Sequence, residues 1–269
     1  MLKKFRNQFA KLRWFVRHRR EIDPQGLVAW FTVSESLGAS LNYCADGLAV
    51  QNNCDCLIEP RFAEAYRLSL AVNDWRRPDG SGYEMRWRYY MYCKFAELAT
   101  RVEGDFVECG VYKGGYALAA MEFTGFRRLG RTFHLLDTFE GLSSRHLTET
   151  EVKAGLLKTY SHYEECYAAV CRTFRDYPVR IIRGAVPETL PQCEAEKIAF
   201  LSIDMNCVDP EVAALRHFWP RLASGAVVLH DDYGFAAHLE QKRAMDRLAD
   251  ELRFSILALP TGQAVIFKP

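Results

Sequence analysis

One short stretch constrains the fold more than any other: an apolar segment at residues 106–109 that ends in a glycine turn and opens a helix. Residues 106–115 read FVECGVYKGG, and helix-forming residues follow from Tyr116. Gly110 and the pair Gly114 and Gly115 allow the backbone to approach a ligand closely, because glycine has no Cβ. The unpaired N–H groups of the first helical turn point toward the same place. This strand–turn–helix unit predicts a nucleotide-type site in a doubly wound α/β sheet.

The spacing of the glycines separates this turn from a dinucleotide fingerprint. That fingerprint needs glycines at offsets of 0, 2 and 5, whereas here they fall at 0, 4 and 5. No phosphate-binding GK[ST] sequence follows, which counts against an ATP site. Glu108 lies two residues before Gly110, and a carboxylate there suits a cationic ligand better than a phosphate. These features predict S-adenosylmethionine, whose amine and sulfonium are both positive. The alternative is a Rossmann-like turn that does not bind this cofactor.

Further cofactor contacts are expected from the strands that follow. A second apolar run ends at Asp137, 22 residues after Gly115, and its carboxylate is expected to hold ribose hydroxyls. The turn at Gly184 and Ala185, after a third strand, is expected to border the adenine. The complete predicted cofactor set is Glu108, Gly110, Tyr112, Gly114, Gly115, Asp137, Thr138, Phe139, Gly184, Ala185 and Asp204.

From Asp105 onward, apolar strands alternate with segments of helical length, which is typical of an α/β fold. The expected strands are 106–108, 132–136, 179–182, 198–203, 226–229, 254–259 and 264–267, and the expected helices include 83–101, 160–175, 208–222 and 236–252. The short turn 260–262 predicts that the last two strands form an antiparallel hairpin. We therefore expect a Rossmann-like, doubly wound, seven-stranded and mostly parallel sheet. The polar segment 142–158 is expected to form a lid over the site.

Three carboxylates fall at neighbouring strand ends. Asp204 ends the apolar run 198–203, and Asp231 and Asp232 end the next one. Acids brought this close repel one another unless a cation lies between them, and all-oxygen ligands favour Mg²⁺. The metal would lower the pKa of a bound acceptor hydroxyl, so that a base can remove its proton. Asp204 or His230 is expected to assist that step. The alternatives are that the acids cap turns and helices, and that His230 is a buried structural residue or a fourth ligand.

Four motifs resemble the macrocin O-methyltransferase family over roughly residues 83–269. They are FVECGV with the following Gly114 and Gly115, LDTFEGL at 136–142, Ile203 with Asp204, and DDYG at 231–234. The resemblance implies a class I S-adenosylmethionine fold, with Mg²⁺ held by Asp204, Asp231 and Asp232. It also implies a methyltransferase domain over 83–269, preceded by an N-terminal helical extension over 1–82. Family members often carry a second acid just after the fourth-strand aspartate, where this chain has Asn206-Cys207-Val208.

The first twenty residues are basic and amphipathic. They carry eight Lys or Arg and no acid, with Leu2, Phe5, Phe9, Leu12 and Val16 at helical spacing. This pattern indicates a helix too charged to span a bilayer. Three interpretations are open: contact with an anionic membrane surface, docking to a partner subunit as in a homodimer, or packing on its own domain.

Charge and cysteine content exclude several classes. The net charge of +1 over 269 residues argues against a nucleic-acid binder. The nine scattered cysteines, with no signal peptide, indicate reduced thiols and a cytoplasmic protein. Cys54 and Cys56 are spaced too tightly for a zinc pair.

The leading hypothesis is a Mg²⁺-dependent S-adenosylmethionine O-methyltransferase that acts on a hydroxyl of a saccharide or a glycosylated natural product. One alternative is a catechol- or phenol-type acceptor, for which the aromatic helix 83–101 would supply walls. Another is a non-catalytic scaffold with a methyltransferase fold.

Overall fold

A computed structural model describes residues 41–73 and 83–269. The amphipathic helix expected over 1–20, with its proposed membrane or partner contact, lies outside the described residues. Within them, no helix is both long enough and apolar enough to cross a lipid bilayer.

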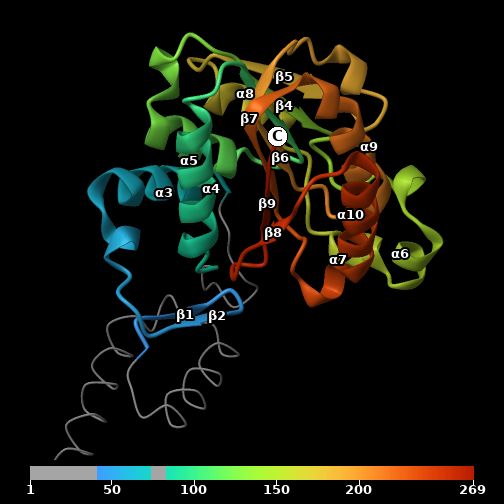
Figure 1. The fold of residues 1–269 in the computed structure, drawn as a ribbon, viewed down its shortest axis with the longest axis horizontal. Coiled ribbons are helices and arrows are strands. Elements are labelled where there is room, and N and C mark those ends of the chain that lie inside the picture. The colour runs from blue at the N-terminus through green and yellow to red at the C-terminus, as the bar shows by residue number, and fades with distance from the viewer. Residues whose placement is uncertain (1–40, 74–82) are drawn as a thin grey trace, which may run out of the picture.

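The central sheet has seven strands in the order β5-β4-β3-β6-β7-β9-β8 (Figure 1). The strands are β3 (Asp105–Cys109), β4 (Phe133–Asp137), β5 (Val179–Arg183), β6 (Ile198–Ile203), β7 (Leu222–His230), β8 (Leu257–Ala258) and β9 (Ala264–Phe267). The first five are parallel, and β9 pairs antiparallel with both β7 and β8. The predicted doubly wound sheet with a terminal hairpin is therefore confirmed.

Helices cover both faces of this sheet, so its central strands are apolar on both sides. On one face lie α3 (Pro60–Asn73), α4 (Arg86–Ala99), α5 (Gly115–Thr124) and α8 (Tyr167–Thr173), and on the other lie α9 (Val208–Phe218) and α10 (Leu239–Leu252) (Figure 1). The core on the α4 and α5 face is rich in aromatic rings, including Tyr92, Phe106 and Phe200. Because side chains alternate along a strand, Glu108 of β3 points into this aromatic core together with Phe106.

The segment 41–73 is folded against the sheet domain. It contains an antiparallel hairpin of β1 (Tyr43–Ala45) and β2 (Leu48–Val50), which had no counterpart among the expected elements. The helix α3 then packs along α5, and the ring of Phe62 lies against Phe123 with centroids 6.4 Å apart. Residues before position 83 therefore border the helix that follows the glycine turn.

Several element boundaries differ from the expected ones. The helix expected over 160–175 begins only at Tyr167, because the chain before it is held by a hydrogen bond from Cys166 N to Phe139 O of 2.9 Å. The strand expected over 254–259 is reduced to β8. The strand expected over 226–229 is longer, since β7 begins at Leu222 and pairs with Ile198.

The polar segment 142–158 forms short helices, among them α6 (Glu149–Lys153). Thr148 caps α6 by accepting a hydrogen bond from Glu151 N, and the Glu151 carboxylate accepts one from Thr148 N. The other oxygen of Glu151 accepts a 2.8 Å hydrogen bond from Val208 N, the first residue of α9. A single buried carboxylate thus holds the start of both helices.

Candidate active site

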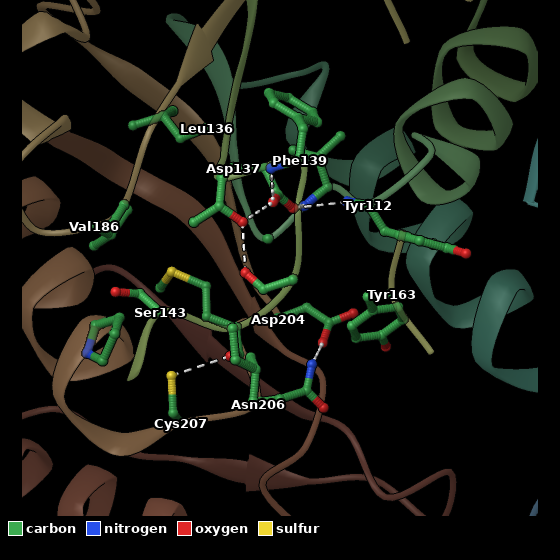
Figure 2. Close-up of a pocket in the computed structure, with 18 of the residues that line it drawn as sticks. Tyr112, Leu136, Asp137, Phe139, Ser143, Tyr163, Val186, Asp204, Asn206 and Cys207 are labelled. Carbon is green, nitrogen blue, oxygen red and sulfur yellow. Dashed lines mark hydrogen bonds between the residues drawn. The ribbon is translucent and has the colours of Figure 1, made fainter. Parts of the chain in front are cut away.

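A cavity opens at the carboxyl ends of β3, β4, β5 and β6, where ligands bind in doubly wound sheets (Figure 2). Its walls include eight of the predicted cofactor residues: Gly110, Tyr112, Asp137, Thr138, Phe139, Gly184, Ala185 and Asp204. Glu108, Gly114 and Gly115 are not among the described residues that line it. The turn after β3 and the ends of the next three strands are thus brought together as the sequence predicted.

Gly110 is the point of closest approach between two strand ends. Its φ is +89°, and a Cβ at this position would lie 1.8 Å from the carbonyl oxygen of Asp204. No side chain fits in that space, so the glycine is required by contact as well as by backbone conformation. The contact holds the turn after β3 beside the acid that ends β6.

Three residues of the cavity wall have left-handed backbone conformations that are unusual outside glycine. They are Tyr112 with φ 49°, Phe139 with φ 58° and Asn206 with φ 58°. Such conformations cost about 1–3 kcal/mol each and persist where the surrounding structure enforces them, often at functional sites. Their gathering around one cavity identifies it as the functional centre of the fold.

The carboxylate of Asp137 is occupied by the loops around it. Its Oδ2 accepts hydrogen bonds from Val111 N at 2.5 Å and Tyr112 N at 2.7 Å, and its Oδ1 accepts one from Phe139 N at 2.7 Å (Figure 2). These three backbone donors use most of the lone pairs of the carboxylate. Asp137 therefore fixes the turns after β3 and β4, and a ribose hydroxyl could bind it only by sharing or displacing one of them.

Glu108 lies below the cavity floor. It is 1% exposed, and neither carboxylate oxygen has a hydrogen-bond partner among the described residues. Burial raises the pKa of Glu108 well above its ordinary value, an effect that the neighbouring Tyr92 hydroxyl offsets only in part. It is placed to support the strand from within the aromatic core.

Asn73, at the end of α3, lines the cavity, and no sequence pattern predicted it. Its Oδ1 accepts a 3.0 Å hydrogen bond from Gly115 N, and its Nδ2 donates to the Tyr89 hydroxyl at 3.0 Å. A Cβ on Gly115 would lie 2.2 Å from the Asn73 amide. The first N–H of α5, expected to face a ligand directly, is thus satisfied by the protein itself.

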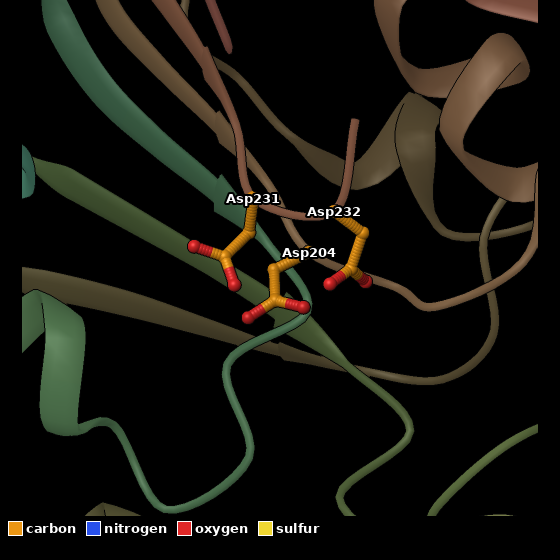
Figure 3. A group of neighbouring side chains, drawn as sticks. All are labelled: Asp204, Asp231 and Asp232. Atoms are coloured by element: carbon orange, nitrogen blue, oxygen red, sulfur yellow. The ribbon is translucent and has the colours of Figure 1, made fainter. Parts of the chain in front are cut away.

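The carboxylates of Asp204, Asp231 and Asp232 point toward one another beside the cavity (Figure 3). One oxygen from each lies within 4.8 Å of the other two. Burial, followed by the charges of Asp231 and Asp232, raises the pKa of Asp204 well above its ordinary value. The predicted convergence of the three acids is therefore present, and only Asp204 also lines the cavity.

Two donors orient Asp231. Arg88 Nη1 donates to its Oδ2 at 2.9 Å, and Gln263 Nε2 donates to its Oδ1 at 2.9 Å. The same guanidinium donates to both oxygens of Asp46, in the turn of the β1–β2 hairpin. Arg88 is thus held between two acids, one from the hairpin and one from the end of β7.

Asp232 provides a test of whether a cation fits. Its Oδ2 is buried and has no hydrogen-bond partner among the described residues. Burial and the charge of Asp231 raise the pKa of Asp232 to about 6. An orphaned carboxylate oxygen next to two further acids is a donor set that suits a hard divalent cation such as Mg²⁺.

His230 is directed away from the cavity. It is 2% exposed, and its Nε2 lies 2.8 Å from Glu211 Oε2 of α9, which is also fully buried. Burial lowers the pKa of His230, but the charge and hydrogen bond of Glu211, together with the charges of Asp232 and Asp231, more than offset it, so that the pKa lies above its ordinary value. His230 is not among the cavity-lining residues of the described structure.

The residues after Asp204 include no further acid at the cavity. Asn206 Nδ2 donates to Asp204 Oδ1 at 3.2 Å, and Cys207 Sγ donates to the Met205 carbonyl (Figure 2). Tyr163, from the segment before α8, forms another part of the wall and packs against Tyr112 with ring centroids 4.7 Å apart. No pattern in the sequence marked Tyr163.

Comparison with known proteins connects this geometry to an enzyme family. The family description of macrocin O-methyltransferases matches residues 85–258, which is more than half of the chain. The mycinamicin III 3''-O-methyltransferase of Micromonospora griseorubida is 26% identical over 60% of this chain and 68% of its own length. The 8-demethyl-8-(2,3-dimethoxy-alpha-L-rhamnosyl)-tetracenomycin-C 4'-O-methyltransferase of Streptomyces olivaceus is 30% identical over 54% of this chain. The match spans only 59% of that relative's length.

A solved structure gives the same fold. The O-methyltransferase NovP superposes with a TM-score of 0.66 at 19% sequence identity, and the match covers 77% of this chain and 97% of that one. The sheet order, the glycine turn and the positions of the strand-end acids described above are thus set in a class I methyltransferase fold. The chain is an O-methyltransferase and belongs to the macrocin O-methyltransferase family.

Proposed function

We propose that this chain transfers a methyl group from S-adenosylmethionine to a hydroxyl of a saccharide or glycosylated natural product, with Mg²⁺ bound by Asp204, Asp231 and Asp232. The observation that carries the proposal is the position of Asp204. It belongs to the acid cluster and also lines the cavity at the glycine turn, so that metal and methyl donor would meet at one residue.

The cavity residues would bind and orient the methyl donor. Gly110 allows the turn after β3 to pack against the Asp204 backbone, while Gly184 and Ala185 line the part of the cavity where the adenine is expected. The rings of Tyr112 and Tyr163 close one side and exclude water from the reacting groups. When bound, S-adenosylmethionine supplies an electrophilic methyl group on its sulfonium.

The acid cluster would hold the metal. Asp231 is fixed by Arg88 and Gln263, and Asp232 retains a free oxygen. When bound, Mg²⁺ would favour ionisation of a coordinated acceptor hydroxyl and orient it toward the methyl group. The chain's own part is to place the three carboxylates within reach of one ion, and this group of possible ligands among the described residues includes no histidine or cysteine that would favour zinc.

The acceptor class follows from the relatives. One carries a rhamnosyl group in the name of its substrate, and another is named for mycinamicin III, so that the sugar of a glycosylated natural product is the first choice. Full-length protein with labelled S-adenosylmethionine should be tested against mycinamicin III and rhamnosylated tetracenomycins, beside a set of catechols. We expect transfer to a glycoside that chelator abolishes and added Mg²⁺ restores. Transfer that is equal in excess chelator would reject the metal role, and transfer to catechols alone would reject the sugar.

Substitution of Asp231 tests the role of the acid cluster. Asp231→Ala should abolish transfer to the glycoside while leaving S-adenosylmethionine binding nearly unchanged in calorimetry, because Asp231 does not line the cavity among the described residues. The exposed Asp176→Asn is the matched control and should retain full activity.

We also infer from the sequence that residues 1–20 make a partner or membrane contact. Deletion of these residues, followed by light scattering and by sedimentation with anionic vesicles, should reduce either the oligomer size or the vesicle-bound fraction. If neither changes, the segment has no such contact.

A further inference from the structure

Methylation of a hydroxyl requires a destination for its proton. Asp204, Asp231 and Asp232 are committed to the metal in the proposed function, and His230 faces Glu211 within the core. In the loop after Asp204, the Asn206 amide donates to Asp204, and the Cys207 thiol donates to the Met205 carbonyl oxygen. The proton acceptor must therefore come from another element beside the acids.

Tyr160 occupies such a position. It follows α7 (Leu156–Thr159), and its ring stacks on the cavity residue Tyr163 with centroids 5.6 Å apart and planes 20° apart. Burial, followed by the charges of Asp232 and Asp204, raises the pKa of Tyr160 well above its ordinary value. Because the phenol is neutral, Tyr160 can accept a proton only if it gives up its own phenolic proton to another group.

A hydrogen-bonded chain leads away from this phenol. The Tyr160 hydroxyl lies 3.0 Å from His238 Nε2, and His238 Nδ1 is bonded to Gln241 Oε1. Gln241 Nε2 donates to Glu211 Oε1 at 2.9 Å. All three residues beyond Tyr160 are buried, at exposures of 9% for His238, 3% for Gln241 and 0% for Glu211.

The direction of donation along these hydrogen bonds follows from the contact between Gln241 and Glu211. Because the Gln241 amide nitrogen donates to a carboxylate, its carbonyl oxygen faces His238 and requires a proton on Nδ1. A neutral imidazole protonated on Nδ1 has a free lone pair on Nε2. The Tyr160 hydroxyl therefore donates to His238, and its own oxygen lone pairs remain available to accept a proton.

We propose that Tyr160 and His238 form the proton relay of this enzyme, with Tyr160 as the group that receives the acceptor's proton. The inference rests on the proposed function. As the acceptor oxygen forms its bond to the methyl carbon, the carbon–sulfur bond breaks and its electron pair returns to sulfur. The acceptor's proton moves to the Tyr160 oxygen, and the original Tyr160 proton moves to His238 Nε2. The positive charge lost from the sulfonium thus reappears on the imidazolium, which is linked through Gln241 to the Glu211 carboxylate.

The test compares single and double variants on the glycoside that the wild type methylates. Tyr160→Phe keeps the stacked ring and removes the hydroxyl, and should lower kcat about 10²- to 10⁴-fold, as expected for loss of general base catalysis. S-adenosylmethionine affinity should stay within about twofold, since the hydroxyl is not part of the cavity wall. The controls are Tyr177→Phe, whose hydroxyl bonds Glu122 away from the site, and the exposed His162→Gln; both should retain wild-type kcat.

His238 acts through Tyr160, so its variant needs a readout that a general loss of structure would not produce. His238→Gln should lower kcat by itself, and adding it to Tyr160→Phe should lower kcat no further, because both changes interrupt one path. Fully additive losses would overturn the relay, as would wild-type kcat in Tyr160→Phe.

The relay and the proposed function fail in different ways. A wild type that methylates none of the glycosides rejects the function and the relay with it, whereas an active wild type with an active Tyr160→Phe rejects the relay alone. If Tyr160→Phe does not fold, nitrogen NMR of His238 in the wild type with S-adenosylhomocysteine bound is the deciding measurement. A protonated Nδ1 with an unprotonated Nε2 supports the relay, and the opposite tautomer overturns it.

Discussion

Arg88 and Asp231 form an ion pair that is buried on both sides. Their side chains are only 10% and 7% exposed, and Nη1 lies 2.9 Å from Oδ2. The pair joins α4 to the end of β7, and the guanidinium continues to Asp46 at 2.8 Å. One cation of the protein thus neutralises part of the negative charge of the acid cluster. The arrangement explains how three carboxylates can be held together before an ion binds.

Loss of Arg88 should be severely destabilising. Arg88→Ala removes the cationic partner of the buried Asp231 and of the half-buried Asp46, which is expected to lower the free energy of unfolding by about 3–5 kcal/mol. Urea unfolding measures the change. Arg67→Ala is the matched control, since its pair with Glu64 is exposed and its loss should leave the free energy of unfolding almost unchanged. A loss for Arg88→Ala no larger than that of the control would contradict the buried pair.

The close approach at Gly110 gives a second prediction. Gly110→Ala would force a Cβ against the Asp204 carbonyl, so we expect loss of S-adenosylmethionine binding together with a large fall in melting temperature. Gly130→Ala shares a positive φ of 65° but has no atom within 4 Å of the added Cβ. It should cost only the backbone term of about 1 kcal/mol and bind the cofactor normally. Equal behaviour of the two variants would show that the contact is unimportant.

Stabilisation by Mg²⁺ should depend on pH through Asp232. Because its pKa is raised to about 6 from an ordinary value of 3.8, the folded metal-free protein binds more protons than the unfolded chain between these values. The contribution of Asp232 to stability is therefore greatest at low pH and is lost as pH rises through about 6. Mg²⁺ needs the ionised carboxylate, so its stabilising effect follows the opposite trend.

Thermal denaturation with and without Mg²⁺ measures this difference. At pH 7.5, Mg²⁺ at 100-fold its dissociation constant should add about 2.7 kcal/mol, or about 5–10 °C. At pH 5 the shift should shrink severalfold. The Asp232→Asn variant should show little Mg²⁺ stabilisation at either pH. A shift that is equal at both pH values in the wild type would exclude Asp232 from the site.

Substitution of Glu108 distinguishes direct contact with S-adenosylmethionine from a structural role. Since the side chain is buried and does not line the cavity among the described residues, Glu108→Gln should alter S-adenosylmethionine affinity less than about threefold. If Glu108 instead bonded the methionine amine as a carboxylate, losing that charge-assisted bond should cost about 1.5–3 kcal/mol, or roughly 10- to 150-fold in affinity. Calorimetry distinguishes the two, with the exposed Glu103→Gln as the control.

The parts of the site that the sequence predicted are those encoded locally. A strand that ends in glycine or aspartate can be recognised from a few consecutive residues, and parallel strands bring such ends to one edge of the sheet. Gly110, Asp204, Asp231 and Asp232 were found in this way. The seven-stranded sheet followed from the same alternation of apolar runs with helical segments.

The parts that were missed depend on contacts between distant residues. Arg88 reaches Asp231 across 143 positions, and Asn73 reaches Gly115 across 42. Neither residue type is unusual in a helix, so nothing local marks it. Asp137 shows a related difficulty: a strand-end carboxylate was expected to face a ribose, but the left-handed turns at Tyr112 and Phe139 direct backbone N–H groups onto it.

Glu151 connects the polar segment 142–158 to α9. Its two oxygens accept hydrogen bonds from Thr148 N and Val208 N at 2.8 Å each, so α6 and the start of α9 share one anchor. Any displacement of α6 would therefore also release the start of α9, which follows the loop that carries Asp204.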